Sequence, residues 1–405
     1  MTKRESQADG LDLQAELDAI LDLGRRAPGS DAERRTALHL RQRLEELGRT
    51  AEVEPLRVYS SWPLGYALLA AATVAAGVLA IYEPLAGAAL ALAATLLTFL
   101  DAGMQVPIVR RLLGRRASQN VISWAGSGKP GAIVLVAHYD AGRAGFAHTD
   151  ANARRKAALS GLVRRPIGGL QPLFWAELAV LACTLLRLVG LDGAAVSAVQ
   201  FVPTLVLIVA VALLADIALS GAKAGENDNA SGCVLALRLT ERYGYSLQHF
   251  DLHVLFTGAQ KAGAAGMRAF LRRHRDRLRP DTTVFVNVDE VGSGAVRYTR
   301  REGALLTLRS HPQLTSLCAD IAEDDESAEP IVSRSAGDAT AAGAAGFPAI
   351  TVTCRDRLDY ASGRVDERAL DAAEGFCAEL IERLDAEVGP SIVAPVEATA
   401  LSEPD

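Results

Sequence analysis

The sequence is poor in cysteine and has no excess of basic residues. Its 405 residues include five cysteines, which are far apart and form no CxxC pair. This distribution indicates small buried side chains in a reducing compartment. The net charge of −6 at pH 7 gives no reason to expect a nucleic-acid partner.

Three further signals are absent. The first residues contain no apolar core of signal-peptide length, so we expect no cleaved secretion signal. The stretch AGSGKPG at residues 125–131 lacks the spacing of a phosphate-binding loop. No Gly-x-Ser-x-Gly elbow with a nearby histidine partner is present. The sequence therefore does not follow the patterns of P-loop enzymes or serine hydrolases.

The sequence does have long hydrophobic blocks. Residues 62–82 contain 21 residues without a charge, and residues 85–100 are again uncharged after a short break at Glu83 and Pro84. About 20 apolar residues cross a bilayer core of roughly 30 Å as a helix. We therefore expect a tight transmembrane hairpin at residues 61–103.

A second block occupies residues 168–219. Its first half carries Glu177 and Arg187, whereas residues 193–215 are 23 residues without a charge. We expect a second transmembrane hairpin at residues 166–220, which gives four membrane spans in total. The alternative is that all four segments are buried core helices of a large soluble protein.

An even number of spans returns the chain to its starting side, so the polar regions share one compartment. Basic residues flank both hairpins on this side, and the turns on the far side carry Glu83 and Asp192 with only Arg187 near them. The positive-inside rule places the polar domain of this integral membrane protein in the cytoplasm. The flanking residues are Arg110, Arg111, Arg115, Arg116, Arg154, Arg155, Lys156, Arg164 and Arg165.

Outside these blocks, strand-like and helix-like segments alternate. This pattern predicts an α/β fold with a doubly wound, mostly parallel sheet. We expect the domain to comprise residues 11–60, 104–165 and 221–388, and residues 1–10 and 389–405 to be disordered. Strands are predicted at residues 51–58, 120–125, 132–140, 253–259, 283–289 and 348–354.

Histidine and acidic residues follow several predicted strands. His138 and Asp140 follow one apolar run, Asp289 follows another, and Asp228 opens a predicted helix. Ligands of open α/β sheets bind at the carboxyl ends of the strands. A histidine and an aspartate two residues apart suit a metal site in which the carboxylate orients the imidazole. Further acids at other strand ends could complete such a site.

Five segments resemble, in order, the motifs of the clan MH di-zinc peptidases: IVLVAHYDAG, GENDNASG, VLFTGAQKAGAAGM, VNVDEVG and GDATAAGAAGFPAI. This group contains co-catalytic aminopeptidases, glutamate-carboxypeptidase-like enzymes and transferrin-receptor-like members without catalysis. The resemblance covers roughly residues 30–60, 117–147 and 221–385. It implies a phosphorylase/hydrolase-like fold into which the hairpins are inserted. It also implies that His138, Asp228 and Asp289 are zinc ligands, with Asp228 bridging two metals and Asp140 orienting His138.

The chain departs from the family pattern at three positions. Gln260 stands where the resemblance places the general base, and Lys261 where it places a zinc ligand. Ala339, after the retained Asp338, replaces a histidine ligand. Loss of the base should remove roughly 10²–10⁴-fold of rate. We hypothesise that the Lys261 ammonium replaces the metal and neutralises the carboxylates; the alternative is that Lys261 points to solvent.

The sequence therefore predicts a membrane-anchored, metallopeptidase-like protein that is catalytically inactive, needs no cofactor and binds a peptide or protein ligand. One alternative is an active zinc-dependent aminopeptidase-type hydrolase with a reduced one-metal site, which Glu226, Glu290 or His148 could help to complete. Strand alternation would point Glu290 away from Asp289, and His148 lies in a predicted mobile loop. A third hypothesis is a transport role for the helices involving Glu177.

Overall fold

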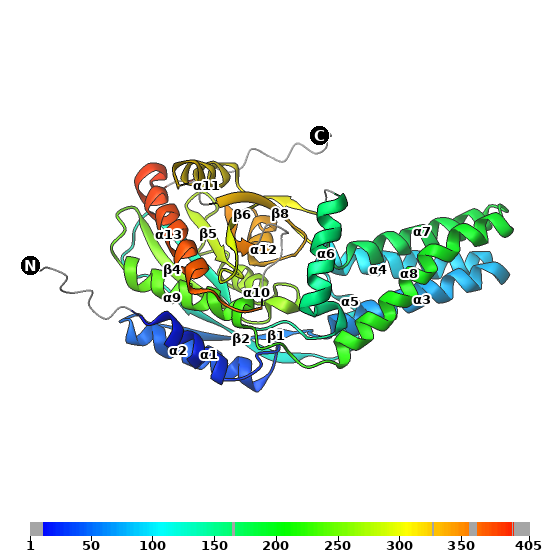
Figure 1. Cartoon of the computed structure of the whole chain (residues 1–405), viewed down its shortest axis with the longest axis horizontal. Helices are drawn as coiled ribbons and strands as arrows, with labels where there is room; N and C mark the ends of the chain where they lie inside the picture. Colours follow the sequence, from blue (N-terminus) through cyan, green and yellow to red (C-terminus); the bar gives the residue numbers. More distant parts are fainter. Residues whose placement is uncertain (1–10, 164–166, 326–327, 356–362, 391, 393–405) are drawn as a thin grey trace, which may run out of the picture.

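The computed structural model describes residues 11–163, 167–325, 328–355, 363–390 and 392. The disorder predicted for residues 1–10 and for most of residues 389–405 lies outside this part of the chain, as do Arg164 and Arg165. The fold is mixed α/β, with four long helices that project from one side of the sheet-containing part (Figure 1).

One nine-stranded sheet occupies the centre of the α/β part, in the order β1-β2-β4-β3-β5-β9-β6-β7, with β8 paired to β6. Strands β4, β3, β5 and β9 are parallel neighbours, so their carboxyl ends meet at one edge of the sheet. The strands are β1 Glu52–Val58, β2 Arg116–Ser123, β3 Gly131–His138, β4 Phe250–Thr257, β5 Thr283–Val288, β6 Ala295–Glu302, β7 Leu308–Arg309, β8 Ala328–Ser333 and β9 Ala349–Arg355.

The prediction of a mostly parallel sheet needs correction. Four of the eight strand pairings, β1–β2, β2–β4, β6–β7 and β6–β9, are antiparallel. Only residues 289–294 separate β5 from β6. A parallel return requires a crossover of about a dozen residues or more, so β6 runs in the opposite direction. Strands β6 to β8 were also absent from the predicted set.

Helices cover both faces of the sheet. Along β3, Ile133 and Leu135 pack into the core on one face, whereas Val134 and Val136 pack on the other. Burial on both faces explains the continuous apolar run of this strand. The first face is covered by α1 Leu13–Asp22, α2 Asp31–Glu46, α9 Ser231–Tyr243, α11 Pro312–Asp325 and α13 Glu367–Arg383, and the second by α10 Ala265–His274 and α12 Asp338–Ala344.

Four apolar helices form a bundle beside the sheet (Figure 1). They are α3 Trp62–Tyr82, α4 Pro84–Ala102, α7 Gln171–Leu188 and α8 Ala194–Leu219, and each is long and apolar enough to cross a membrane. The short helix α5 Ile108–Leu112 follows α4, and α6 Asp150–Val163 lies between the bundle and the α/β part. The mobile loop predicted around His148 is therefore wrong, since η1 Phe146–His148 and α6 occupy this segment.

The core supports a matched test of burial. Leu135 is fully buried in β3, whereas Leu308 on β7 is 40% exposed. We expect Leu135→Ala to lower the free energy of unfolding by about 2–5 kcal/mol because it leaves a cavity in the core. Leu308→Ala should change it by about 0.5 kcal/mol or less. Denaturant titrations of both variants, followed by circular dichroism, measure the difference; equal losses would contradict this packing.

Candidate functional site

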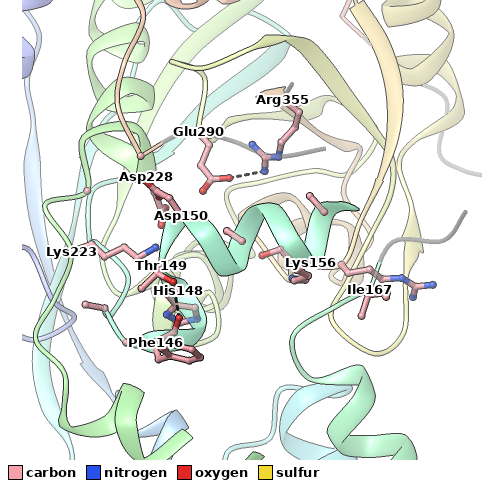
Figure 2. Close-up of a pocket in the computed structure, with 18 of the residues that line it drawn as sticks. Phe146, His148, Thr149, Asp150, Lys156, Ile167, Lys223, Asp228, Glu290 and Arg355 are labelled. Carbon is pink, nitrogen blue, oxygen red and sulfur yellow. Dashed lines mark hydrogen bonds and ion pairs between the residues drawn. The ribbon is translucent and has the colours of Figure 1, made fainter. Parts of the chain in front are cut away.

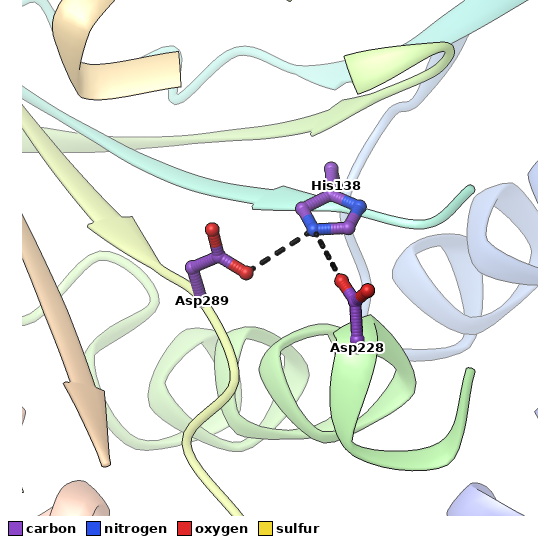
Figure 3. A group of neighbouring side chains, drawn as sticks. All are labelled: His138, Asp228 and Asp289. Carbon is purple, nitrogen blue, oxygen red and sulfur yellow. Dashed lines mark hydrogen bonds and ion pairs between the residues drawn. The ribbon is translucent and has the colours of Figure 1, made fainter. Parts of the chain in front are cut away.

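Three side chains from different elements converge at the carboxyl ends of the parallel strands (Figure 3). His138 ends β3, Asp289 follows β5, and Asp228 lies in η2 Glu226–Ala230, which opens α9. The His138 Nε2 atom lies 3.2 Å from Asp289 Oδ1 and 3.4 Å from Asp228 Oδ1. These three residues offer ligand atoms that lie within 4.8 Å of one another. They are the three residues that the sequence nominated as metal ligands.

His138 faces oxygen acceptors on both ring nitrogens. Its Nδ1 atom lies 3.0 Å from the backbone carbonyl oxygen of Asp140, which can only accept a hydrogen bond. Its Nε2 atom faces the carboxylate of Asp289. Burial and the nearby Lys261 ammonium lower the pKa of His138, but the carboxylates outweigh them and raise this pKa well above its usual value. Both ring nitrogens thus lie within hydrogen-bond distance of oxygen acceptors.

Lys261 lies in η3 Gln260–Ala262, directly after β4. Its Nζ atom is 2.7 Å from Asp228 Oδ1, and both side chains are 23% exposed. Burial lowers the pKa of Lys261, but Asp228 and Asp289 raise it above its usual value. Burial likewise acts to raise the pKa of Asp228, but the Lys261 ammonium holds it well below its usual range. Lys261 thus points into the site and not into solvent.

Asp140 fixes the loop that carries Lys261. Its carboxylate accepts hydrogen bonds from the backbone amides of Gln260, at 2.8 Å, and of Lys261, at 2.9 Å. Gln260 is buried at the position that the resemblance assigns to the general base. An amide side chain cannot take a proton from water near neutral pH.

Glu290 also belongs to the site, against the prediction from strand alternation. It adopts a positive φ of 54° after β5 has ended, so the alternation of the strand no longer applies to it. Its carboxylate pairs with the Arg355 guanidinium at 2.6 Å. Both residues line a small chamber of about 80 Å³ together with Lys261 and Asp289.

Each of the three clustered acids thus has a cation of its own. A basic side chain thus lies within hydrogen-bond distance of each of these carboxylates, where its positive charge offsets their mutual repulsion. The pairs are Asp228 with Lys261, Asp289 with His138, and Glu290 with Arg355.

Three other nominated residues have different positions. The Glu226 carboxylate accepts a hydrogen bond from the Val365 amide at 2.9 Å, which ties η2 to a neighbouring segment. Asp338 is fully buried and accepts a hydrogen bond from Thr257 Oγ1. The His148 ring contacts the Arg143 carbonyl at 2.8 Å. None of the three belongs to the group of potential ligands formed by described residues.

Sequence reasoning missed two charged residues of this region. Arg355 is the last residue of β9, and the rule that sites lie at carboxyl strand ends could have found it. Glu302 ends β6 and accepts hydrogen bonds from the Gly337 amide and Thr351 Oγ1. Because β6 was not predicted as a strand, no sequence signal placed Glu302 near the site.

A larger cavity of about 950 Å³ adjoins the cluster. Helix α6 crosses it, and Asp228, Glu290 and Arg355 lie on its wall (Figure 2). Phe146 and His148 line it near the start of α6, and Asp216 and Ser220 line it at the end of α8. The cavity therefore lies between the cluster and the bundle.

The residues present do not fit a pair of zinc ions. Lys261 already contacts the Asp228 oxygen that lies nearest to His138. At the position of the second histidine ligand, Ala339 is buried and offers only a methyl group. His138, Asp228 and Asp289 have the spacing for a single ion, but the protonated Lys261 amine beside Asp228 would repel it.

Comparisons with known proteins agree with the motifs. Residues 211–373 match the model of peptidase family M28, which confirms the predicted relationship to the clan MH peptidases. No curated protein matches the chain.

Solved structures share the fold. The aminopeptidase from Aneurinibacillus sp. strain AM-1 has a TM-score of 0.52 at 12% identity, over 96% of this chain and 97% of that one. BSAP, a zinc aminopeptidase from Bacillus subtilis, has a TM-score of 0.51 at 12% identity, over 94% and 97%. Tannerella forsythia glutaminyl cyclase has a TM-score of 0.50 at 12% identity, over 91% and 97%.

Asp338 gives a pH-dependent prediction. Burial raises its pKa to about 7, above the 3.8 of an exposed aspartate. Between these two values the folded state holds more protons than the unfolded state, so protonation of Asp338 stabilises the fold at low pH. This contribution to the free energy of unfolding is lost as the pH rises through 7. Asp338→Asn, which is always neutral, should gain stability relative to the unchanged protein as the pH rises from 5 to about 8. Melting temperatures over this range measure the effect; a constant difference would contradict it.

Proposed function

We propose that the protein, whose residues 211–373 match the model of peptidase family M28, is a catalytically inactive, membrane-anchored relative of these peptidases. It binds a ligand at the former active site and does not hydrolyse it. The observation that carries this proposal is the ion pair between Lys261 and Asp228 at 2.7 Å.

Two arguments support the loss of metal chemistry. First, the acids of the cluster already have basic side chains as partners, so a divalent ion would have to displace or approach these groups. Second, Lys261 stands where the resemblance places a zinc ligand, and a protonated amine has no lone pair to offer a metal. Neither argument depends on Gln260.

The loss of the base is a separate argument. Proton transfer from an attacking water needs a group that can accept the proton. Gln260 cannot do so, and Asp140 uses both carboxylate oxygens to hold the loop. In this proposal the position that the resemblance assigns to the general base therefore supplies none.

The ligand site in this proposal is the cavity of about 950 Å³. Its lining combines charges of both signs with small polar side chains, which suits a peptide or a segment of a partner protein. Because Asp216 and Ser220 of the α8 end line it, a ligand would meet the site close to the bilayer surface. The four apolar helices span the bilayer in this proposal, with the α/β part in the cytoplasm.

Metal analysis of the purified chain tests the proposal. After dialysis against metal-free buffer, we expect far less than one zinc ion per chain. A triple variant, Gln260→Glu with Lys261→Glu and Ala339→His, restores the family residues and should gain tightly bound zinc and aminopeptidase activity. Stoichiometric zinc in the unchanged protein would overturn the proposal, and a triple variant that gains neither property would contradict the assignment of these positions.

A one-metal hydrolase is the second candidate. It is favoured by the spacing of His138, Asp228 and Asp289, whose ligand atoms lie within 4.8 Å of one another. In that case Lys261 would have to leave Asp228 when the ion binds. The same metal analysis separates the two candidates.

Lys261→Ala gives a second prediction. Without the ammonium, Asp228 and Asp289 repel each other, and we expect a loss of about 1–3 kcal/mol of stability in the presence of a chelator. Zn²⁺ should restore this stability in the variant and leave the unchanged protein unaffected. Lys223→Ala is the matched control, because Lys223 lines the same cavity and the described residues give it no ion pair. Equal zinc effects in all three proteins would count against the exchange of metal for ammonium.

A further inference from the structure

The loop that carries Gln260 and Lys261 has its own supports on the side of the sheet. Asp140 accepts hydrogen bonds from both backbone amides. The Ala259 amide donates to Glu33 Oε1 at 2.9 Å. These contacts fix the first half of the loop to the strands.

A second support comes from the bundle. Arg110, in the short helix after α4, donates from Nη1 to the backbone carbonyl of Ala262 at 3.1 Å. The same atom reaches the Tyr59 carbonyl at 3.4 Å, at the end of β1. Arg110 was counted among the basic residues that flank the first hairpin, but it is buried here. Its guanidinium joins the loop, the first strand and the first hairpin.

The last turn of α4 holds this guanidinium in place. Arg110 Nε donates to Asp101 Oδ2 at 2.8 Å, and Arg110 Nη2 donates to the other oxygen. Both side chains are only 4% exposed. A two-bonded pair between a guanidinium and a carboxylate fixes orientation as well as distance, so a shift of α4 moves Arg110 with it.

The loop depends on outside contacts because its backbone is unfavourable. Ala259 and Ala264 have positive φ values of 52° and 49°, and Gly263 between them has 85°. Residues with a Cβ seldom adopt this conformation, which persists only where the surroundings impose it. The Gly263 backbone also passes close to Arg110, since a Cβ at this position would lie 3.4 Å from Nη2.

We propose that Arg110 is a positioning residue that ties the Lys261 loop to the first hairpin, so that the packing of α4 controls where Lys261 lies. The connection continues into the bundle. Thr98, one turn before Asp101 on α4, donates from Oγ1 to Glu177 Oε1 of α7 at 3.1 Å. This role goes beyond ligand binding, because it makes the site responsive to the arrangement of the apolar helices.

Amide hydrogen exchange tests the proposal in the full-length protein. In Arg110→Gln, the amides of residues 259–265 should exchange about tenfold faster or more, because the loop loses a charge-assisted hydrogen bond. Arg111→Gln is the matched control, since Arg111 neighbours Arg110 on the same short helix and is exposed. The amides of β9 should not change in either variant. Equal exchange of the loop in both variants would overturn the proposal.

Amine labelling gives a readout that a general loss of stability would not imitate. Acylation of Lys261 should be slow in the unchanged protein and several-fold faster in Arg110→Gln. Lys129, whose Nζ donates to the Tyr245 carbonyl, serves as the internal reference and should keep its rate. Asp101→Asn, which keeps the shape of the side chain, should act in the same direction and replaces Arg110→Gln if that variant does not fold.

The outcomes separate this inference from the proposed function. Fast labelling of Lys261 in the unchanged protein would refute its ion pair with Asp228 and hence the proposed function. Slow labelling that stays slow in both variants would refute only the positioning role of Arg110. Faster labelling of Lys261 and Lys129 together would show general unfolding and also count against it.

Discussion

The structure of the site depends on the positive charge that lies beside the Asp228 carboxylate. Carboxylates converge at the ends of parallel strands because the fold brings these ends together, and they need a cation within a few ångströms. In this chain the Lys261 ammonium lies 2.7 Å from Asp228, and Asp289 and Glu290 have His138 and Arg355. A cation that is part of the chain cannot dissociate. The positive charge beside Asp228 is therefore supplied by the chain itself.

Each potential metal ligand of the cluster has protein partners of its own. The His138 ring is held through the Asp140 carbonyl, and the Asp140 carboxylate holds the loop after β4. Ion pairs of this kind contribute little net stability, because the loss of hydration offsets most of the attraction. Their role is to hold the geometry of the strand ends, and the buried core on both faces of the sheet supplies the stability. The charges of the site and the stability of the fold thus depend on different residues.

Much of this arrangement could be predicted from sequence, for identifiable reasons. Strand β3 is continuously apolar up to His138 because it is buried on both faces, and α3 and most of α8 are uncharged over long stretches; both signals are strong. Strand β6, which pairs with β7, β8 and β9, carries several charged residues, and β8 carries a glutamate and a proline, so neither strand is continuously apolar and no such signal arises. The direction of Glu290 was missed because a positive φ after β5 breaks the alternation. Arg110 was assigned to the flank of a hairpin because charge counts do not reveal burial.

Both pairs of apolar helices enter the fold next to the loops that form the site. The first pair is inserted between β1 and β2, which still pair in register from Glu52 with Ile122 to Val58 with Arg116. The second follows β3, and Arg143 closes the end of α8 by donating to the Ala218 and Ser220 carbonyls. An enzyme that opens and closes around its substrate needs loops that move freely. Loops fixed to a helical bundle on two sides suit a protein in which binding at the cavity and the packing of the helices influence each other.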